Sequence, residues 1–329
     1  MHDSAQCILA GDIGGTKTRL AVFSVTGLQL DTLAEHSYPS NQYASLGAII
    51  EEFSAAHDYL PDAASFGIAG PVRDNCARTT NLPWHISAAD IARDFRIKRV
   101  TLLNDLEATA WGVRALTEDD FHVLNDGTPN PLGNTAIIAA GTGLGEAGLA
   151  RIGDGFQPFA TEGGHADFGP GSELEIELLR FLMERYGHVS WERVLSGPGL
   201  VDLHDFLCHH RGQPMPGWLQ QEMRTGDPAA AVSAAAASGR DPLSSEALEL
   251  FVHLYGAEAG NLALKLMASG GLYIGGGIAP RILGQLTTGA FMNAFVSKGR
   301  MRPLLEQIPV RVILNDRAAL YGPAVFATA

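Results

Sequence analysis

A short apolar run followed by a cluster of glycines occurs three times along the chain. The three passages are residues 7–16, 135–145 and 272–277. After the first two, a second apolar run begins, at residues 20–23 and 147–152. The pattern therefore predicts a strand, a glycine turn and a second strand twice, which suggests a weak internal repeat. Such a turn is either an ordinary hairpin turn or a cradle whose glycine N–H groups hold a phosphate.

A fourth apolar run, residues 100–103, ends in the polar residues Asn104 and Asp105, and a helical pattern begins at once. A strand that opens directly onto a helix is where α/β proteins bind ligands, because backbone donors and the helix dipole meet there. Asn104 with Glu107 three residues later fits a capping box, and Asp105 is favoured in any first helical turn. Asp105 is therefore either only a helix-starting residue or also a catalytic base.

Segments with apolar residues at helical spacing alternate with these strands. They are residues 44–58, 172–186, 198–210 and 227–270. This alternation predicts an α/β fold. Because 329 residues exceed the usual size of a single core, we expect two domains around an interdomain cleft.

An acidic segment that contains proline and glycine, residues 118–134, marks the boundary between the two expected domains. A last helix that starts at Asp316 can return to the first domain. We therefore expect residues 1–115 together with 316–329 in a small α/β domain, and residues 116–315 in a large α/β domain.

The charge of the chain limits its partners. The sequence has 23 Lys and Arg against 36 Asp and Glu, a net charge of −13, which disfavours nucleic-acid binding. No uncharged, glycine-free apolar run reaches the roughly 18 residues of a membrane-spanning helix. Residues 1–4 carry no basic group ahead of an apolar stretch, so we expect no signal peptide and a cytoplasmic protein without membrane partners.

One nucleotide-binding motif is nearly matched and a second is matched in full, and both are rejected. Residues 11–18 resemble a P-loop, but Thr16 stands where a glycine should precede Lys17, and a strand pattern follows where a helix is required. Residues 143–148 match G-x-G-x-x-G, but again a strand pattern follows in place of the helix that a dinucleotide site needs.

Three ionisable residues, Glu162, His165 and Glu192, lie in or beside glycine-rich segments. Paired carboxylates and an imidazole can select the hydroxyl groups of a sugar, because an analogue that lacks a partner leaves a polar group unsatisfied. Taken one by one, they can equally be a surface acid, a core histidine and an exposed helix acid.

Together these segments resemble, in order and spacing over nearly the whole chain, those of bacterial-type glucokinases in the sugar kinase, Hsp70 and actin superfamily. The resemblance implies a two-domain actin-like ATPase (ribonuclease H-like) fold whose domains close over glucose, with ATP and Mg²⁺ along the cleft. Lys17 stands where that family often has Asn. The zinc-binding cysteine cluster of the related repressor-and-kinase branch is absent from this sequence, so zinc is not expected.

The resemblance also implies a role for each matching residue. It makes Asp105 the base that faces the sugar 6-hydroxyl, and it makes Asp12 the acid that faces Mg²⁺ or its water shell. The implied sugar-binding residues are Asn104, Glu162, His165, Glu192 and Gly143. The implied nucleotide-binding residues are Gly11, Asp12, Ile13, Gly14, Gly15, Thr16, Gly141, Thr142, Gly275, Gly276 and Gly277.

We therefore expect ATP-dependent phosphorylation of glucose to glucose 6-phosphate by a hexokinase-type enzyme. The chemistry agrees, because phosphoryl transfer needs chiefly a carboxylate base, a metal ion and backbone donors around the phosphates. One alternative is a kinase for another hexose, such as mannose or fructose. The other is a non-catalytic sugar sensor, which the net negative charge and a first strand beginning by residue 8 oppose. The family leads us to expect a homodimer.

Overall fold

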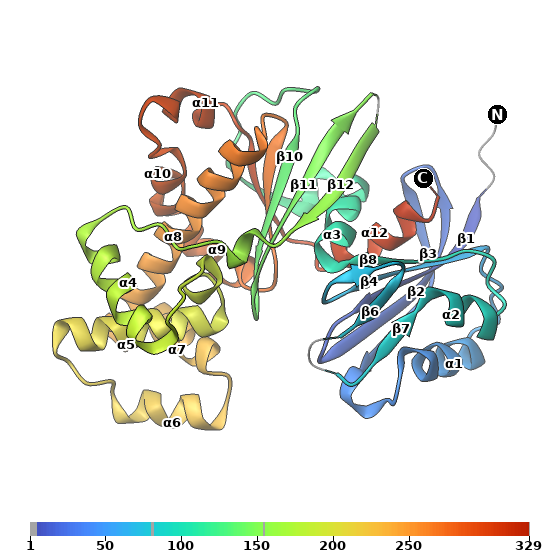
Figure 1. Ribbon diagram of the computed structural model, residues 1–329, viewed down its shortest axis with the longest axis horizontal. Helices are drawn as coiled ribbons and strands as arrows, with labels where there is room; N and C mark the ends of the chain where they lie inside the picture. The colour runs from blue at the N-terminus through green and yellow to red at the C-terminus, as the bar shows by residue number, and fades with distance from the viewer. Residues whose placement is uncertain (1–4, 80–81, 154, 329) are drawn as a thin grey trace. The chain divides into compact units, whose positions relative to one another are not determined.

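The computed structural model describes residues 5–79, 82–153 and 155–328, which divide into two compact units (Figure 1). The first unit comprises Met1–Asp120, Pro158–Ala160 and Asn315–Ala329, and the second comprises Phe121–Gln157 and Thr161–Leu314. Residues 1–4, on which the expectation about a signal peptide rests, lie outside the described residues. None of the helices in the described ranges is long and apolar enough to cross a membrane.

The first unit is built on a mixed sheet with the strand order β3-β2-β1-β4-β8. In this sheet β1 is antiparallel to β2 and parallel to β4, and β8 is parallel to β4. A small separate sheet pairs β5, β6 and β7. The strands of this unit are β1 (Gln6–Ile13), β2 (Lys17–Thr26), β3 (Gln29–Pro39), β4 (Ala63–Ile68), β5 (Val72–Arg73), β6 (Cys76–Arg78), β7 (His85–Ser87) and β8 (Val100–Asn104).

Helices cover both faces of the larger sheet in the first unit, so its inner strands are apolar on both sides. Along β1, Leu9 faces the core that holds residues of α1 and α2, and the neighbouring Ile8 packs with Leu320 of α12. Figure 1 shows α1 and α2 on one side of this sheet and α12 on the other. The helices of this unit are α1 (Leu46–Ala56), α2 (Ala88–Asp94), α3 (Asp105–Gly112) and α12 (Ala318–Phe326).

Glycines hold α3 tightly against α12. A Cβ atom on Gly322 of α12 would overlap the carbonyl oxygen of Ala108, and a Cβ atom on Gly112 would overlap the carbonyl oxygen of Ala318. On the sheet side, a Cβ atom on Gly67 would lie 2.7 Å from the Cβ atom of Ala108. Such close packing on two sides fixes the position of α3, and with it the first residue of that helix.

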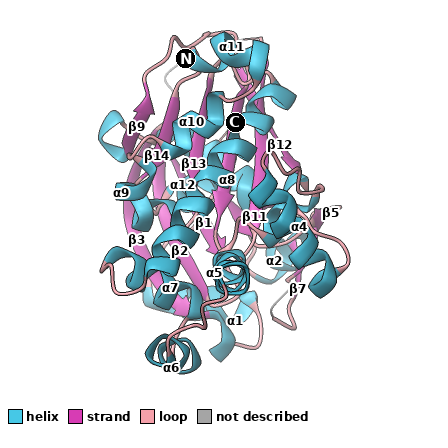
Figure 2. Ribbon diagram, turned by 90° about the vertical axis from the view of Figure 1, so that its left-hand side faces the viewer, coloured by secondary structure: helices cyan, strands magenta, loops and turns pink. Residues whose placement is uncertain are grey.

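The second unit is built on a sheet with the order β12-β11-β10-β13-β14-β9, whose strands are drawn in magenta in Figure 2. Here β10 is antiparallel to β11 and parallel to β13, as β1 is to β2 and β4 in the first unit. The shared arrangement agrees with the predicted internal repeat. The strands are β9 (Phe121–Asn125), β10 (Thr135–Ala140), β11 (Leu144–Ile152), β12 (Gly155–Thr161), β13 (Gly271–Gly275) and β14 (Val310–Ile313).

The largest core of the second unit forms around the long helix α8, which buries Phe251 and Tyr255 completely. The predicted helical segment 227–270 is two helices, because the chain turns between α7 and α8 at Gly239, which has φ +64°. The helices of this unit are α4 (Glu173–Tyr186), α5 (Gly197–Arg211), α6 (Gly217–Thr225), α7 (Pro228–Ala237), α8 (Pro242–Leu266), α9 (Leu283–Leu286), α10 (Ala290–Val296) and α11 (Arg302–Glu306).

Candidate functional site

The predicted capping box at the start of α3 is present. The side-chain Oδ1 of Asn104 accepts a hydrogen bond from the Leu106 N–H at 2.9 Å, and Oε2 of Glu107 accepts one from the Asn104 N–H at 3.1 Å. The Asn104 amide also donates to the carbonyl oxygen of Gly70 at 3.2 Å. Because an amide oxygen has two lone pairs and an amide nitrogen has two hydrogens, Asn104 retains capacity for a ligand after these bonds.

Asp105 is the first residue of α3 and is half-buried. Its Oδ1 accepts a hydrogen bond from the Leu106 N–H at 2.9 Å, the same donor that Asn104 contacts. The amino end of a helix favours acidic residues, so an aspartate is well placed at this position. The geometry of Asp105 therefore agrees with both interpretations: the residue begins the helix, and it offers a carboxylate directly after a strand end.

Ser40 organises the first glycine loop, and sequence reasoning missed it. The Ser40 hydroxyl donates to the carbonyl oxygen of Gly14 at 2.8 Å, and its N–H donates to the carbonyl oxygen of Thr16 at 3.0 Å. The Gly14 N–H donates across the turn to the Lys17 carbonyl oxygen at 3.0 Å. Ser40 is buried after β3, so only the pairing of β3 with β2 brings it to this loop.

The residues of the first loop differ in their surroundings. Gly11 and Ile13 are buried in the sheet, and a Cβ atom on Gly11 would lie 2.6 Å from a ring carbon of Phe66. Packing alone therefore accounts for the glycine at position 11. Gly14 and Gly15 are half-buried and Thr16 is exposed, so these three residues are the accessible part of the loop.

Asp12 lies near the end of β1, with both basic and acidic side chains around it. Burial raises the pKa of its carboxyl, while Arg19 and Lys17 act in the opposite direction. Arg19 in turn contacts Asp316 at 2.7 Å and Glu35 at 3.9 Å. No local sequence pattern predicts the contact between Arg19 and Asp316, because the two residues are far apart in the sequence.

The surroundings of Asp12 fit a metal ion that arrives with a ligand. A partly desolvated carboxylate gains from a nearby cation, and Mg²⁺ is commonly held by one or two carboxylates, water and phosphate oxygens. Within the residues that the structure describes, no group of three or more His, Cys, Asp or Glu could hold a metal ion by itself. The Asp12 carboxylate is the kind of oxygen ligand that Mg²⁺ accepts when water and phosphate oxygens complete its coordination.

Three of the predicted sugar-binding residues gather in the second unit. His165 lies 3.9 Å from Oε2 of Glu162 through Nε2 and 3.9 Å from Oε1 of Glu192 through Nδ1. The side chains of Glu162, His165 and Glu192 are 76%, 62% and 33% exposed. At 3.9 Å these side chains do not hydrogen-bond to each other, so their polar atoms can still bind other partners.

Backbone pairing brings the two turns with these side chains together. Glu162 precedes η4 (Gly163–His165), His165 is its last residue, and Glu192 lies in η5 (Trp191–Arg193). The Trp191 N–H donates to the Ala166 carbonyl oxygen at 3.0 Å, and the Phe168 N–H donates to the Val189 carbonyl oxygen at 2.9 Å. The buried rings of Phe168 and Trp191 pack edge to face with centroids 5.0 Å apart.

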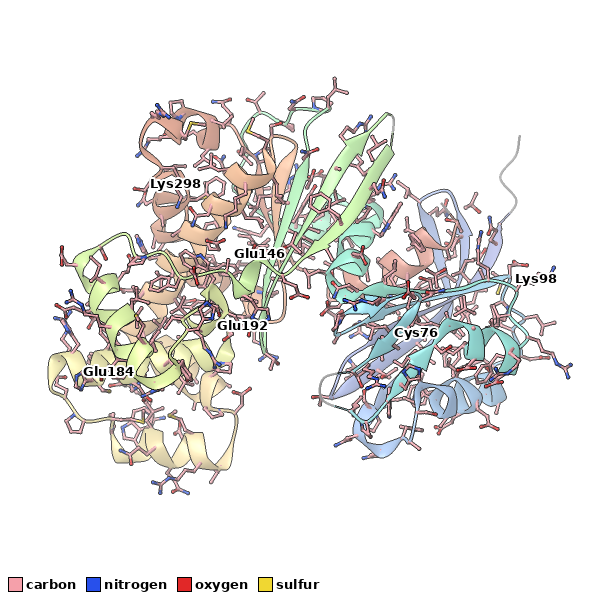
Figure 3. All side chains as sticks on the ribbon, in the orientation of Figure 1. Cys76, Lys98, Glu146, Glu184, Glu192 and Lys298 are labelled. Atoms are coloured by element: carbon pink, nitrogen blue, oxygen red, sulfur yellow. The ribbon has the colours of Figure 1, made fainter. Side chains whose placement is uncertain are left out.

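Gly143 lies directly against Glu192, which Figure 3 labels. A Cβ atom at position 143 would overlap Oε2 of Glu192, the oxygen that accepts a hydrogen bond from the Leu144 N–H at 3.0 Å. The second glycine loop therefore contacts the Glu192 carboxylate directly. The absence of a side chain at Gly143 leaves room for that carboxylate.

Replacing Gly143 with alanine should displace the Glu192 carboxylate. We expect the KM for the sugar to rise roughly tenfold, about the loss of one good hydrogen bond, while the fold remains intact. Steady-state kinetics on the purified variant checks this. Gly217→Ala is the matched control, because a Cβ atom there meets nothing within 4 Å. An unchanged KM in Gly143→Ala would contradict the contact.

The remaining glycine segments have accessible backbone. The Gly141 N–H donates to the Gly143 carbonyl oxygen, and the Gly197 N–H donates to the Gly141 carbonyl oxygen, both at 2.8 Å. A Cβ atom on Gly141 or Gly277 would meet nothing within 4 Å. Gly276 has φ +81° and would clash with Ala140 if it carried a side chain. Gly275 is buried, whereas Gly276, Gly277 and Thr142 are exposed.

Comparison with known proteins gives a consistent match. Residues 9–329 match the glucokinase family. A glucokinase from Nostoc punctiforme is 43% identical over 335 residues, which cover 97% of this chain and 98% of the relative. The crystal structure of glucokinase from an Antarctic psychrotroph is 30% identical and superposes with a TM-score of 0.88, covering 98% of this chain and 99% of that chain.

A more distant structure has the same fold. It is the ROK family glucokinase from Streptomyces griseus in complex with glucose and AMPPNP, with a TM-score of 0.65 and 21% identity over 98% of this chain and 99% of that chain. These similarities confirm the expected fold class, the actin-like ATPase (ribonuclease H-like) type.

Proposed function

This chain belongs to the glucokinase family, and on that premise we propose that it transfers the γ-phosphoryl group of ATP to the 6-hydroxyl of glucose. The protein is a hexokinase-type phosphotransferase. The proposal adds ATP as the phosphoryl donor, glucose as the phosphoryl acceptor, and the roles of individual residues.

One observation carries the choice of a sugar as acceptor: Glu162, His165 and Glu192 gather around one glycine-lined turn. Two carboxylates and an imidazole can accept and donate the several hydrogen bonds that neighbouring sugar hydroxyls offer. Glu192 is the least exposed of the three, and its carboxylate also accepts a hydrogen bond from the Leu144 N–H. The complex of the Streptomyces griseus glucokinase with glucose supports the choice of glucose.

Asp105 takes the role of the base. Its carboxylate lies at the amino end of α3 and accepts the proton of the 6-hydroxyl as the oxygen attacks phosphorus. The proton leaves the nucleophile at the moment the new bond forms, so this contact matters most in the transition state. Asn104 holds the helix start in place through its capping bonds and contributes its spare amide hydrogen to the sugar.

The accessible glycine backbones hold the phosphates of ATP. Gly15 and Thr16 in the first unit, and Thr142 in the second, present N–H groups of the kind that bind anions, while the N–H groups of Gly14 and Gly141 hold the shape of their loops. Gly276 and Gly277 form the open backbone on which the adenosine lies. Asp12 holds Mg²⁺ or its water shell, and the ion, when bound, neutralises charge on the phosphates. AMPPNP, an ATP analogue, in the Streptomyces griseus glucokinase supports this choice of donor.

A hexose panel tests the proposal. Release of ADP is measured in a coupled assay with ATP and Mg²⁺, with glucose, mannose and fructose each supplied as the acceptor. We expect the highest kcat/KM for glucose. A much higher value for mannose or fructose would replace glucose as the substrate, and glucose binding without product formation would favour a sugar sensor.

A further inference from the structure

A buried carboxyl group lies immediately behind the sugar-binding turn. Glu146 belongs to β11 and is 2% exposed (Figure 3). A Cβ atom on Gly163 would overlap Oε2 of Glu146 and lie 2.9 Å from its Cδ. Gly163 stands between Glu162 and His165, so the carboxyl group supports the turn that carries both side chains.

The backbone of Glu146 supports the same turn. The Thr161 hydroxyl donates to the Glu146 carbonyl oxygen at 3.0 Å and accepts from the Gly163 N–H at 3.1 Å. The next residue, Gly164, is buried against Leu144 of the same strand. The position of η4 is therefore set by β11 through Leu144 and Glu146.

Glu146 does not stand alone in the core. Glu258 of α8 is fully buried, and its charge acts on Glu146. Lys265 contacts Glu258 at 3.0 Å, and Asn261 donates to the same carboxylate at 2.7 Å. Lys298 is half-buried, and burial lowers the pKa of its ammonium group, while the charges of Glu258 and Glu175 act in the opposite direction. Glu175 in turn lies 3.4 Å from His253. Burial raises the pKa of the Tyr255 hydroxyl group, and the charge of Glu146 raises it further.

The protonated form of Glu146 accounts for this arrangement. Among the described residues, no hydrogen-bond donor reaches Oε1 of Glu146, although the atom is buried. A buried acceptor without a partner is costly, and two buried carboxylates cannot both ionise cheaply. A proton on Glu146 removes one charge and provides an O–H donor for Glu258. Burial, followed by the charge of Glu258, raises the pKa of Glu146 to about 7.

We propose that Glu146 is a positioning residue of the sugar site: its protonated carboxyl, packed between Gly163 and Glu258, holds the Glu162–His165 turn in place, and sugar binding weakens when the proton is lost. The inference rests on the proposed function, since it assigns a regulation to that same site. Ionisation would add a buried negative charge directly behind a turn that already presents two carboxylates. The turn and its side chains must then move away from Glu146, or remain in place at a higher electrostatic energy.

The pH dependence follows from the sign of the shift. Between the ordinary value of 4.5 and about 7, the folded protein holds a proton on Glu146 that the unfolded chain has released. This group therefore contributes stability at low pH that is lost as pH rises through that range. If only the protonated form binds sugar well, the KM for glucose rises up to about tenfold per pH unit above neutrality.

Glu146→Gln tests the proposal, because glutamine keeps the shape and a donor for Glu258 but cannot ionise. The KM and kcat for glucose are measured from about pH 6 to about pH 8.5. We expect the wild-type KM to rise at least threefold more than that of Glu146→Gln, with similar kcat values. Glu184→Gln on the exposed surface of α4 is the matched control (Figure 3). Parallel KM profiles for wild type and Glu146→Gln would overturn the inference.

A second variant keeps the test independent of the folding of the first. In Glu258→Gln the facing charge is removed, so the pKa of Glu146 falls and the rise in KM should move to lower pH. An unmoved rise would overturn the inference. If the proposed function is wrong, the wild-type protein does not turn over glucose at any pH, and the inference fails with it. This result differs from parallel or unmoved KM profiles, which overturn the inference alone.

Discussion

Asp105→Asn should lose roughly 10²- to 10⁴-fold in kcat while glucose still binds. Asparagine keeps the size of the side chain and an oxygen that can accept from the Leu106 N–H, so the start of α3 should survive the change. It cannot accept the proton of the sugar 6-hydroxyl, and that interaction is needed in the transition state rather than in the ground state. Steady-state kinetics combined with calorimetric titration of glucose separates the two effects.

The control for this prediction is Asp58→Asn, which makes the same substitution at an exposed position after α1 and should leave kcat unchanged. If calorimetry showed that Asp105→Asn loses glucose binding together with activity, Asp105 would be chiefly a binding residue. Near-normal kcat would remove it from the reaction altogether.

Glu192→Gln should raise the KM for glucose roughly 10- to 100-fold, with a smaller effect on kcat. The change removes the charge from hydrogen bonds that are worth about 1.5–3 kcal/mol when one partner is ionised. Glutamine can still accept from the Leu144 N–H, so the second glycine loop should keep its position. The variant therefore separates the charge of Glu192 from its support of that loop.

Glu184→Gln provides the matched comparison, since it makes the same change on an exposed face of α4 in the same unit. Circular dichroism of both variants shows whether the fold is kept. A KM for Glu192→Gln within twofold of the wild-type value would exclude this carboxylate from sugar binding.

Local sequence patterns predicted those parts of the fold that local forces determine. The capping box at Asn104 and Glu107 involves residues three apart, and both strand–turn–strand passages follow from apolar runs with glycines between them. β9 was missed because Phe121–Asn125 is short and lies in an acidic segment that is typical of a loop. Its partner β14 is far away in sequence, so only the folded sheet brings the two strands together.

In the candidate site, too, local motifs were predicted from the sequence and long-range contacts were not. Glu162, His165 and Glu192 were identified from their motifs, and the structure brings these three together. Ser40 and Glu146 were not identified, because each acts on a residue that only the pairing of strands places beside it. Burial on both sides of β11 also removes the alternation that would have marked Glu146 as unusual. The cleft, the homodimer and the cytoplasmic location stay predictions.

The place of α12 in the first unit has a consequence for biosynthesis. A ribosome makes β1 long before α12, yet Leu320 and Ala324 of α12 cover the sheet face that carries Ile8 and Phe23. The second unit is complete in sequence once Leu314 has emerged. The segment of the first unit that precedes the second unit is therefore translated earlier, yet its core closes only after the second unit has been made. Until then other parts of the nascent chain or chaperones must cover this apolar face.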